Sequence, residues 1–504
     1  MNITAPLRSI SAAQAVEHFD VLIVGAGISG VGSAYHLTRQ LPDTTFVVLE
    51  EQETFGGTWW THKYPGIRSD SDLHTFGYSF KPWVGPPIAT ADEIRAYMGE
   101  VIDENDLARH IRYRHRINAA SWSSETRQWT IEAIEQESGE VRVFTANFLW
   151  MCQGYYRHSE GYTPEWQGMQ DFQGRIVHPQ RWPQDLATEG KRIVVIGSGA
   201  TAATLIPNIA NQCEHVTMLQ RSPTYFRTGR NAIELAEELR RLQVKEEWIH
   251  EIVRRKILFE QDLFTRRSFT EPDKVKQELL GGIRAALGPG HEETVQKHFT
   301  PSYRPWRQRI AFVPDADLFE AVKGGKASVV TDEIDRFTRD GILLKSGETL
   351  KADIIITATG FNLSVLGDIA FEVDGKPLDF ADTVTYRGMM FTGIPNMAWV
   401  FGYFRASWTL RTDLVADFVC RLLGHMKAKG ARKVVPALRP QEGNMPLQAW
   451  IDPENFNPGY LMRDMHLLPK RGDKPEWQHN QDYWAEKDEF PAIDLKDHVF
   501  VYGS

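Results

Sequence analysis

The stretch Phe19-Asp-Val-Leu-Ile-Val24-Gly25-Ala-Gly27-Ile-Ser-Gly30 decides the fold of this chain. Its apolar run predicts a buried parallel strand, and the GxGxxG pattern predicts a tight turn into a helix. Such a turn lets the backbone approach a pyrophosphate, and the helix N-terminus offers N–H donors to it. Glu50 lies 50 − 30 = 20 residues beyond Gly30, at the end of a second apolar run. A carboxylate at that point accepts hydrogen bonds from ribose hydroxyls.

A second strand–turn–helix pattern begins at Arg192, with Gly197-Ser-Gly199-Ala200-Thr201-Ala202 as its turn. Here the next strand ends in Gln220-Arg221-Ser222 and offers no carboxylate. A ribose 2′-phosphate needs a cation, and an arginine binds it bidentately while a serine adds a hydroxyl donor. We therefore expect NADPH rather than NADH at this second site. The alternative for Arg221 is a solvated surface arginine.

The first nucleotide is expected to be FAD, with NAD as the alternative. The pair Gly56-Gly57 follows the ribose carboxylate closely, which is typical of flavoproteins with this fold. The predicted FAD-site residues are Gly25, Gly27, Gly30, Glu50, Gly57, Thr58, Trp59, Tyr64 and Asp70.

The two patterns predict an α/β protein with two dinucleotide-binding, Rossmann-like domains. Leu235, Leu239 and Leu242 recur at helical spacing, which predicts a helical insertion in the NADP-binding domain. A helix is also expected over 413–426. The expected FAD-binding domain spans 17–155 and 385–504, including a C-terminal tail; the NADP-binding domain spans 156–226 and 306–384, around an insertion over 227–305.

Composition narrows the class of protein. The 504 residues carry a net charge of −9, which argues against nucleic acid as the main partner. Only 3 cysteines are present and no CxxC pair occurs, so neither a disulfide framework, a zinc ribbon nor a dithiol redox centre is expected. We expect no metal site, a cytoplasmic location and no transmembrane segment, and the N-terminus shows no signal peptide. A peripheral membrane contact stays open, as do a monomer and a weak homo-oligomer.

Between the two turns lies Phe172-Gln-Gly174-Arg-Ile-Val-His178-Pro-Gln-Arg-Trp182-Pro183. This segment resembles the FxGxxxHxxxW fingerprint of Baeyer–Villiger monooxygenases, which are class B flavoprotein monooxygenases. The stretches 64–72, 217–225 and 406–410 resemble the subgroup that activates the thioamide ethionamide. The resemblance covers nearly the whole chain. It implies that His178 and Trp182 form a hinge next to the NADP-binding domain, with a structural histidine as the alternative.

The resemblance also implies an activity: NADPH reduces FAD, and a C4a-peroxyflavin formed with O₂ inserts oxygen into a ketone or oxidises a sulfide or thioamide. Arg309 matches the family's catalytic arginine, and Asp70 would orient it. Arg307 is the alternative for the arginine, and a turn aspartate is the alternative for Asp70. Gln308 stands where the family has a lysine that helps to hold the 2′-phosphate.

Three other functions are alternatives for this sequence. A flavin-containing monooxygenase restricted to nitrogen and sulfur would share the nucleotide sites but not the attack on a carbonyl. A pyridine-nucleotide–disulfide reductase would need a CxxC pair, which is missing. A non-catalytic redox sensor would have no use for Arg309 and Asp70.

Overall fold

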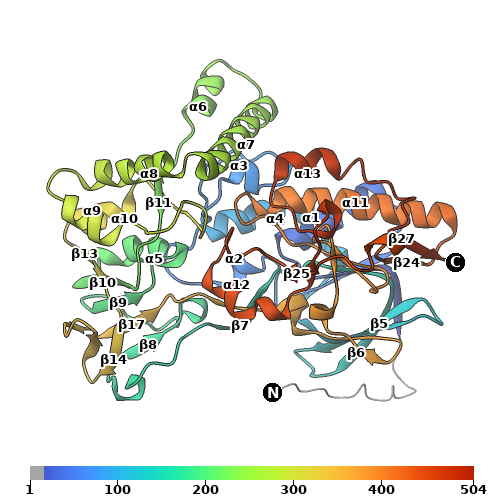
Figure 1. Ribbon diagram of the computed structural model, residues 1–504, viewed down its shortest axis with the longest axis horizontal. Coiled ribbons are helices and arrows are strands. Elements are labelled where there is room, and N and C mark those ends of the chain that lie inside the picture. Colours follow the sequence, from blue (N-terminus) through green and yellow to red (C-terminus); the bar gives the residue numbers. More distant parts are fainter. Residues whose placement is uncertain (1–15) are drawn as a thin grey trace.

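Two lobes, each built on a mainly parallel sheet, form the body of the protein (Figure 1). The computed structural model describes residues 16–504, so most of the N-terminal stretch examined for a signal peptide lies outside the described residues. Within the described part, no helix is long and apolar enough to cross a membrane.

The first sheet contains the strand–turn–helix pattern that opens the sequence. Its strands run in the order β20-β19-β4-β5-β6-β1-β2-β3, with β23 also pairing β6. β1, β2, β3, β6 and β23 pair in parallel, whereas β4, β5 and β6 form an antiparallel meander. The strand bounds are β1 Glu17–Val24, β2 Phe46–Leu49, β3 Ile111–Arg112, β4 His115–Ser123, β5 Gln128–Glu135, β6 Val141–Met151, β19 Ala370–Val373, β20 Lys376–Pro377 and β23 Met397–Trp399.

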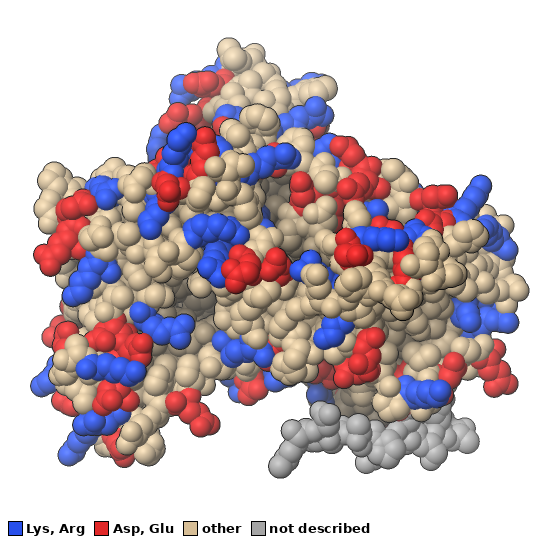
Figure 2. Space-filling view, viewed as in Figure 1, with Lys and Arg blue, Asp and Glu red and all other residues tan. Residues whose placement is uncertain are grey.

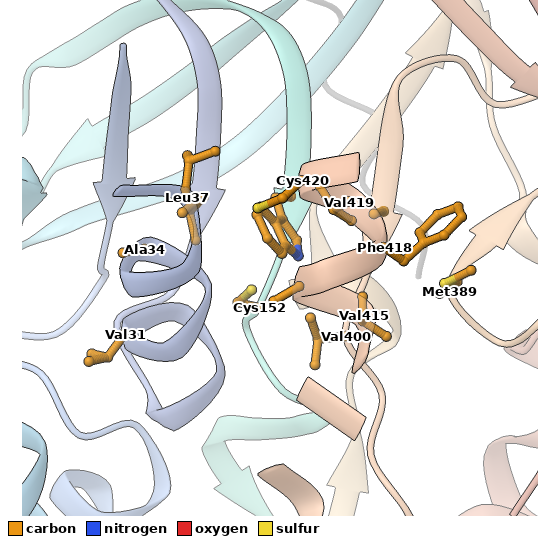
Figure 3. Packing of buried hydrophobic residues seen from close by; sticks show 14 of the residues in the cluster. Val31, Ala34, Leu37, Cys152, Met389, Val400, Val415, Phe418, Val419 and Cys420 are labelled. Carbon is orange, nitrogen blue, oxygen red and sulfur yellow. The ribbon is translucent and has the colours of Figure 1, made fainter. Parts of the chain in front are cut away.

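Helices from both ends of the chain cover this sheet. α1 (Ile28–Gln40) packs on α11 (Trp408–Lys429), and the apolar side chains between them are almost fully buried (Figure 3). α11 extends the helix expected over 413–426 at both ends. Three more helices precede β3: α2 (Thr58–Thr61), α3 (Leu73–Phe76) and α4 (Ala91–Glu104). The core of the first lobe thus depends on residues nearly four hundred positions apart.

The second sheet is all parallel, in the order β13-β10-β9-β17-β8. Its strands read as continuous apolar runs because both faces are covered. The elements of this lobe are β8 Arg175–Val177, β9 Arg192–Ile196, α5 Ala200–Ala210, β10 His215–Gln220, α10 Asp317–Lys323, β13 Ala327–Thr331 and β17 Ile354–Thr357, with an antiparallel sheet of β14 Ile334–Thr338, β15 Gly341–Leu344 and β16 Thr349–Lys351 beside them.

The predicted insertion is helical and projects from the second lobe, at the top of Figure 1. It contains α6 (Glu234–Arg241), α7 (Glu246–Thr270), α8 (Pro272–Leu287) and α9 (Glu292–His298). β11 (Phe226–Gly229) and β12 (Ala311–Pro314) flank it and pair with each other in parallel. This pairing brings the two ends of the insertion together at its base.

The chain crosses between the lobes twice. β7 (Tyr156–Gly161) leaves the first sheet after β6, and β18 (Phe361–Leu363) returns after β17; the two pair antiparallel. The first predicted domain boundary, at 155/156, coincides with this crossing. The predicted return at residue 385 is too late, because β19, which begins at Ala370, already pairs with β4 of the first sheet.

The remaining helices and paired strands, all after the second crossing, are short. They are α12 (Gly459–Asp464), α13 (Tyr483–Glu489) and the pairs β21 (Thr385–Tyr386) with β22 (Met390–Phe391), β24 (Lys433–Pro436) with β27 (Phe500–Gly503) and β25 (Gln448–Ala449) with β26 (Lys470–Arg471). On the face shown in Figure 2, basic and acidic side chains are largely interspersed.

Candidate active site

The first glycine turn is compact because its glycines have no room for a side chain. Gly25 has φ +95°, and a Cβ on it would lie 3.1 Å from the carbonyl oxygen of Cys152. A Cβ on Gly30 would lie 1.8 Å from the carbonyl oxygen of Gly25. Gly57 (φ +55°) starts α2 against Gly27, where a Cβ would lie 3.2 Å from the Gly27 Cα. The predicted FAD-site residues Thr58 and Trp59 then form the first turn of α2.

Glu50 faces this turn from the end of β2. Its Oε2 accepts a hydrogen bond from the backbone N–H of Ala26 at 2.6 Å, and Oε1 accepts one from Gln52 at 2.8 Å. Burial raises the pKa of Glu50 to about 7, although these two hydrogen bonds act in the opposite direction. Each carboxylate oxygen keeps a second acceptor position for a ribose hydroxyl.

The second glycine turn repeats this arrangement. A Cβ on Gly197 (φ +124°) would lie 2.3 Å from the carbonyl oxygen of Ala358, whereas a Cβ on Gly199 would meet no atom within 4 Å. α5 begins at Ala200, and its N-terminus has no side-chain cap. The open space beside Gly199, next to uncapped N–H groups, fits a pyrophosphate. The first turn is thus closed by backbone contacts, whereas the second leaves open space at Gly199.

The residues predicted to read the 2′-phosphate lie together at the end of β10. Arg221 and Ser222 are exposed, and the carboxylate of Glu333 lies close enough to Arg221 to interact with it electrostatically. Tyr303, which precedes Gln308 in the chain, donates its hydroxyl to the carbonyl of Pro223 at 3.5 Å, shortly after the end of β10.

Tyr64 lies between the two predicted nucleotide sites rather than within the first. It is buried in the apolar cluster of the second lobe, and its hydroxyl hydrogen-bonds Thr201 on α5. Burial raises the pKa of Tyr64 above its ordinary value. The side chain therefore connects the segment after α2 to the first turn of α5.

Asp70 and Arg309 form a bidentate ion pair. The Nε of Arg309 lies 2.8 Å from Oδ2 of Asp70, and Nη2 lies 3.0 Å from Oδ1. Their side chains are 38% and 25% exposed, so the pair faces open space rather than the core. The Asp70 carboxylate raises the pKa of Arg309 above its ordinary value. Arg307 points elsewhere, to Glu454 at 3.1 Å, so the arginine beside Asp70 is Arg309.

Three tyrosines that no sequence pattern singled out lie near Arg309. The hydroxyls of Tyr155 and Tyr156 lie 2.6 Å apart, and Tyr460 hydrogen-bonds both. Burial raises the pKa of each hydroxyl, and the nearby Arg309 charge lowers it in part. Tyr155 and Tyr156 follow directly after the glycine that ends the β6 segment, a position that could have drawn notice. Tyr460 lies in the tail and carries no sequence signal.

The fingerprint segment lies at the crossing between the lobes. The backbone N–H of Gln180 donates to His178 Nδ1 at 3.2 Å, so His178 Nε2 carries the hydrogen and donates to the carbonyl of Gly360 at 3.0 Å. A Cβ on Gly174 would lie 2.2 Å from the carbonyl oxygen of Asp353. Phe172 is buried under the second sheet, and Trp182 packs against its other face just before Pro183.

Two glycine turns and a bidentate arginine–carboxylate pair are the features expected of an oxidoreductase that binds two nucleotides. A family model described as flavin-binding monooxygenase-like matches residues 19–231. The FAD-containing monooxygenase EthA of Mycobacterium tuberculosis is 45% identical over 469 residues, covering 93% of this chain and 94% of the relative. The probable FAD-binding monooxygenase AlmA of an Acinetobacter species is 42% identical over 486 residues, 96% of each. The chain therefore belongs to the flavin-binding monooxygenase-like family, which confirms the predicted class.

Solved structures agree on the fold. A steroid monooxygenase bound to NADP superposes with a TM-score of 0.73 at 23% identity, over 96% of this chain and 99% of that one. A cyclohexanone monooxygenase superposes with a TM-score of 0.67 at 21% identity, over 84% and 91%. The predicted α/β architecture of two Rossmann-like domains is confirmed. The predicted cofactors, FAD and NADPH, agree with the family and with the molecules named in these relatives.

Proposed function

We propose that this protein is an NADPH- and O₂-dependent Baeyer–Villiger monooxygenase that converts ketones into esters or lactones and also oxidises sulfides or thioamides. The observation that carries the proposal is the bidentate Asp70–Arg309 pair, whose side chains are 25% and 38% exposed. FAD would bind at the turn 25–30 with Glu50 on its ribose, and NADPH at the turn 197–202 with Arg221 and Ser222 on its 2′-phosphate.

The two cofactors, when bound, supply the hydride and the activated oxygen. The chain supplies a fixed positive charge. As oxygen adds to a ketone, negative charge develops on the carbonyl oxygen, and a preorganised guanidinium stabilises that charge. Asp70 holds Arg309 by two parallel hydrogen bonds, so the guanidinium keeps one orientation without reorganising during the reaction. The paired carboxylate also keeps Arg309 from turning toward bulk solvent.

Oxidation of nitrogen or sulfur alone is the competing function. In that reaction no negative charge builds up on a substrate oxygen, so a fixed guanidinium at that point brings little benefit. The presence of the Asp70–Arg309 pair is the observation that favours ketone oxidation.

Product analysis tests the proposal. Purified protein with FAD, NADPH and air should convert a linear ketone such as 2-decanone into an ester and an aryl methyl thioether into a sulfoxide. A sulfoxide without any ester would favour the heteroatom-restricted function. NADPH that leaves the flavin oxidised under anaerobic conditions, with no product from either compound, would favour the non-catalytic sensor.

We further propose that the fingerprint acts as a hinge for the NADP-binding domain. His178 holds the return crossing at Gly360, while Trp182 packs on the second lobe, so the segment touches both moving parts. His178→Ala should keep bound FAD but slow anaerobic flavin reduction by NADPH in stopped-flow absorbance. An unchanged reduction rate would leave His178 as a structural histidine.

A further inference from the structure

A cleft of about 380 Å³ lies between α7 of the helical insertion and the C-terminal tail. Its lining mixes polar and apolar side chains, and the apolar ones include Phe269 from α7, Phe404 from the segment before α11, and Trp450 and Phe456 from the tail. This volume lies in the range of small-molecule sites, where apolar walls bind most of a ligand and a few polar groups orient it.

Two arginines lie side by side here: Arg405 lines the cleft, and Arg304 contacts two of its lining residues, Asn455 and Phe269. Nη2 of Arg405 donates to the carbonyl oxygen and to Oδ1 of Asn455, both at 2.9 Å, and Nη2 of Arg304 donates to the same two atoms at 2.8 and 3.2 Å. Both guanidiniums also lie over the ring of Phe269, at 5.1 and 4.3 Å from its centroid. The two like charges are therefore neighbours that share one neutral residue.

Neither charge is balanced by a carboxylate. Among residues 16–504, no Asp or Glu oxygen lies within ion-pair distance of Arg304 or Arg405, although most other buried or half-buried arginines have one. Arg405 is only 8% exposed, and its other contact is the carbonyl of Trp306 at 3.4 Å. Burial together with the neighbouring Arg304 lowers the pKa of Arg405 to about 10, which still leaves it charged at neutral pH.

The other charged groups of the cleft are already engaged. Asp262 pairs with Arg266 at 2.8 Å. Asp452 accepts the N–H of Glu454 and Asp482 accepts the N–H of Ala485. Arg471 donates to a backbone carbonyl, and His479, whose pKa burial lowers well below its ordinary value, is neutral. Arg304 and Arg405 are thus two adjacent cations without a carboxylate partner, one of them almost fully buried, and a buried charge without a counter-ion is costly to the fold.

We propose that this cleft binds an organic carboxylate with an apolar chain, its carboxylate on the Arg304–Arg405 pair and its chain along the aromatic walls. Resting on the proposed function, the substrates of this protein are ketones or sulfides that carry a distal carboxylate. Arg304 and Arg405 are specificity-determining residues under this proposal, because they contact the carboxylate and not the reacting atoms.

Calorimetric titration tests the site independently of turnover. With the FAD-loaded protein, octanoate should bind roughly tenfold or more tightly than methyl octanoate, since a hydrogen-bonded charge contact contributes about 1.5–3 kcal/mol. Arg405→Gln and Arg304→Gln should each remove this preference. Arg266→Gln is the matched control: it lines the same cleft but its charge is balanced by Asp262, so the preference should persist.

Three results would overturn the site: equal binding of octanoate and its methyl ester, an unchanged preference in both glutamine variants, or displacement of octanoate by NADP⁺, which would assign the cations to a coenzyme phosphate.

Turnover then tests the substrate class. The kcat/KM for 9-oxodecanoate should exceed that for 2-decanone in the wild type and not in Arg405→Gln. Equal values in the wild type would overturn the substrate class. Octanoate binding without oxidation of either ketone would uphold the site and contradict the proposed function instead.

Discussion

At the scale of single residues, Arg307 and Arg309 show that close neighbours in sequence can have different ion-pair partners. Arg307 and Arg309 are two positions apart, yet one pairs with the exposed Glu454 and the other with Asp70. A guanidinium held bidentately by a carboxylate is oriented as well as charged. This difference makes Arg307 a control for Arg309.

Arg309→Ala should lower ester formation from 2-decanone by about a hundredfold or more, the usual effect of removing one preorganised donor from a developing oxyanion. Sulfoxide formation should fall much less. Parallel product assays with the ketone and a thioether measure both. Arg307→Ala should leave both rates near wild type. Equal losses of ester and sulfoxide in Arg309→Ala would show that Arg309 serves a step common to both reactions.

Arg221 offers a second prediction at this scale. Arg221→Ala should weaken NADPH binding roughly tenfold or more, because a charge-assisted contact to the 2′-phosphate is lost. NADH binding should change little, since NADH has no such phosphate. Coenzyme titrations of wild type and variant give both dissociation constants. A parallel loss for NADH would mean that Arg221 does not read the phosphate.

At the scale of elements, glycines at different positions of the two strand–turn–helix units have different physical roles. Gly30 is needed for packing within the turn, because a Cβ there would collide with the backbone of Gly25. Gly199 is surrounded by open space and is needed only where a ligand approaches. The first kind of glycine supports the fold, and the second supports binding.

Two alanine variants test the role in the fold and the role in binding separately. Gly30→Ala should lower the thermal unfolding temperature and the FAD content of the purified protein, because α1 or the turn must shift. Gly199→Ala should leave the unfolding temperature of the coenzyme-free protein unchanged and weaken NADPH binding. Differential scanning fluorimetry and flavin absorbance distinguish the two variants. A strong drop in unfolding temperature for Gly199→Ala would refute the distinction.

At the scale of the whole molecule, a buried ion pair joins the beginning and the end of the first lobe. His36 on α1 lies 3.0 Å from Asp413 and 3.3 Å from Asp417, both on α11. Burial alone lowers the pKa of His36, but its hydrogen bonds to these two carboxylates outweigh burial and raise the pKa to about 9. The charged pair therefore stabilises the packing of α1 on α11.

This raised pKa sets a pH dependence of stability. His36 titrates near 6.5 in the unfolded chain, so its contribution is fully present below about pH 6.5 and is lost as pH rises through about 9. The full contribution is about 3 kcal/mol, because each pKa unit corresponds to about 1.4 kcal/mol. Urea unfolding at pH 6.5 and pH 9.5 should show a larger loss in wild type than in His36→Gln. An identical loss in both proteins would contradict this role of His36.

A feature of this protein could be predicted from the sequence when it depends on residues that lie close together in the chain. The glycine turns, the position of the Glu50 carboxylate against the first turn and the helical insertion follow from residue type and spacing along a short stretch, so they could be predicted. The resemblance placed Asp70 with Arg309, which local patterns cannot do across 239 positions. The return of the chain to the first sheet was predicted at residue 385, which is too far along the sequence. The reason is that β19 is a four-residue strand whose pairing with β4 has no local sequence signal.

The sequence by itself determined the class of this protein: two nucleotide turns of different chemistry, separated by a fingerprint. Tertiary structure alone decided which side chains meet. It brought Tyr460 from the tail to Arg309, separated Arg307 from that site, and placed Arg304 from the end of the insertion beside Arg405 without a carboxylate. The physical reason is that backbone conformation is set by neighbours in sequence, whereas charge balance and burial are set by whatever the folded chain brings into contact.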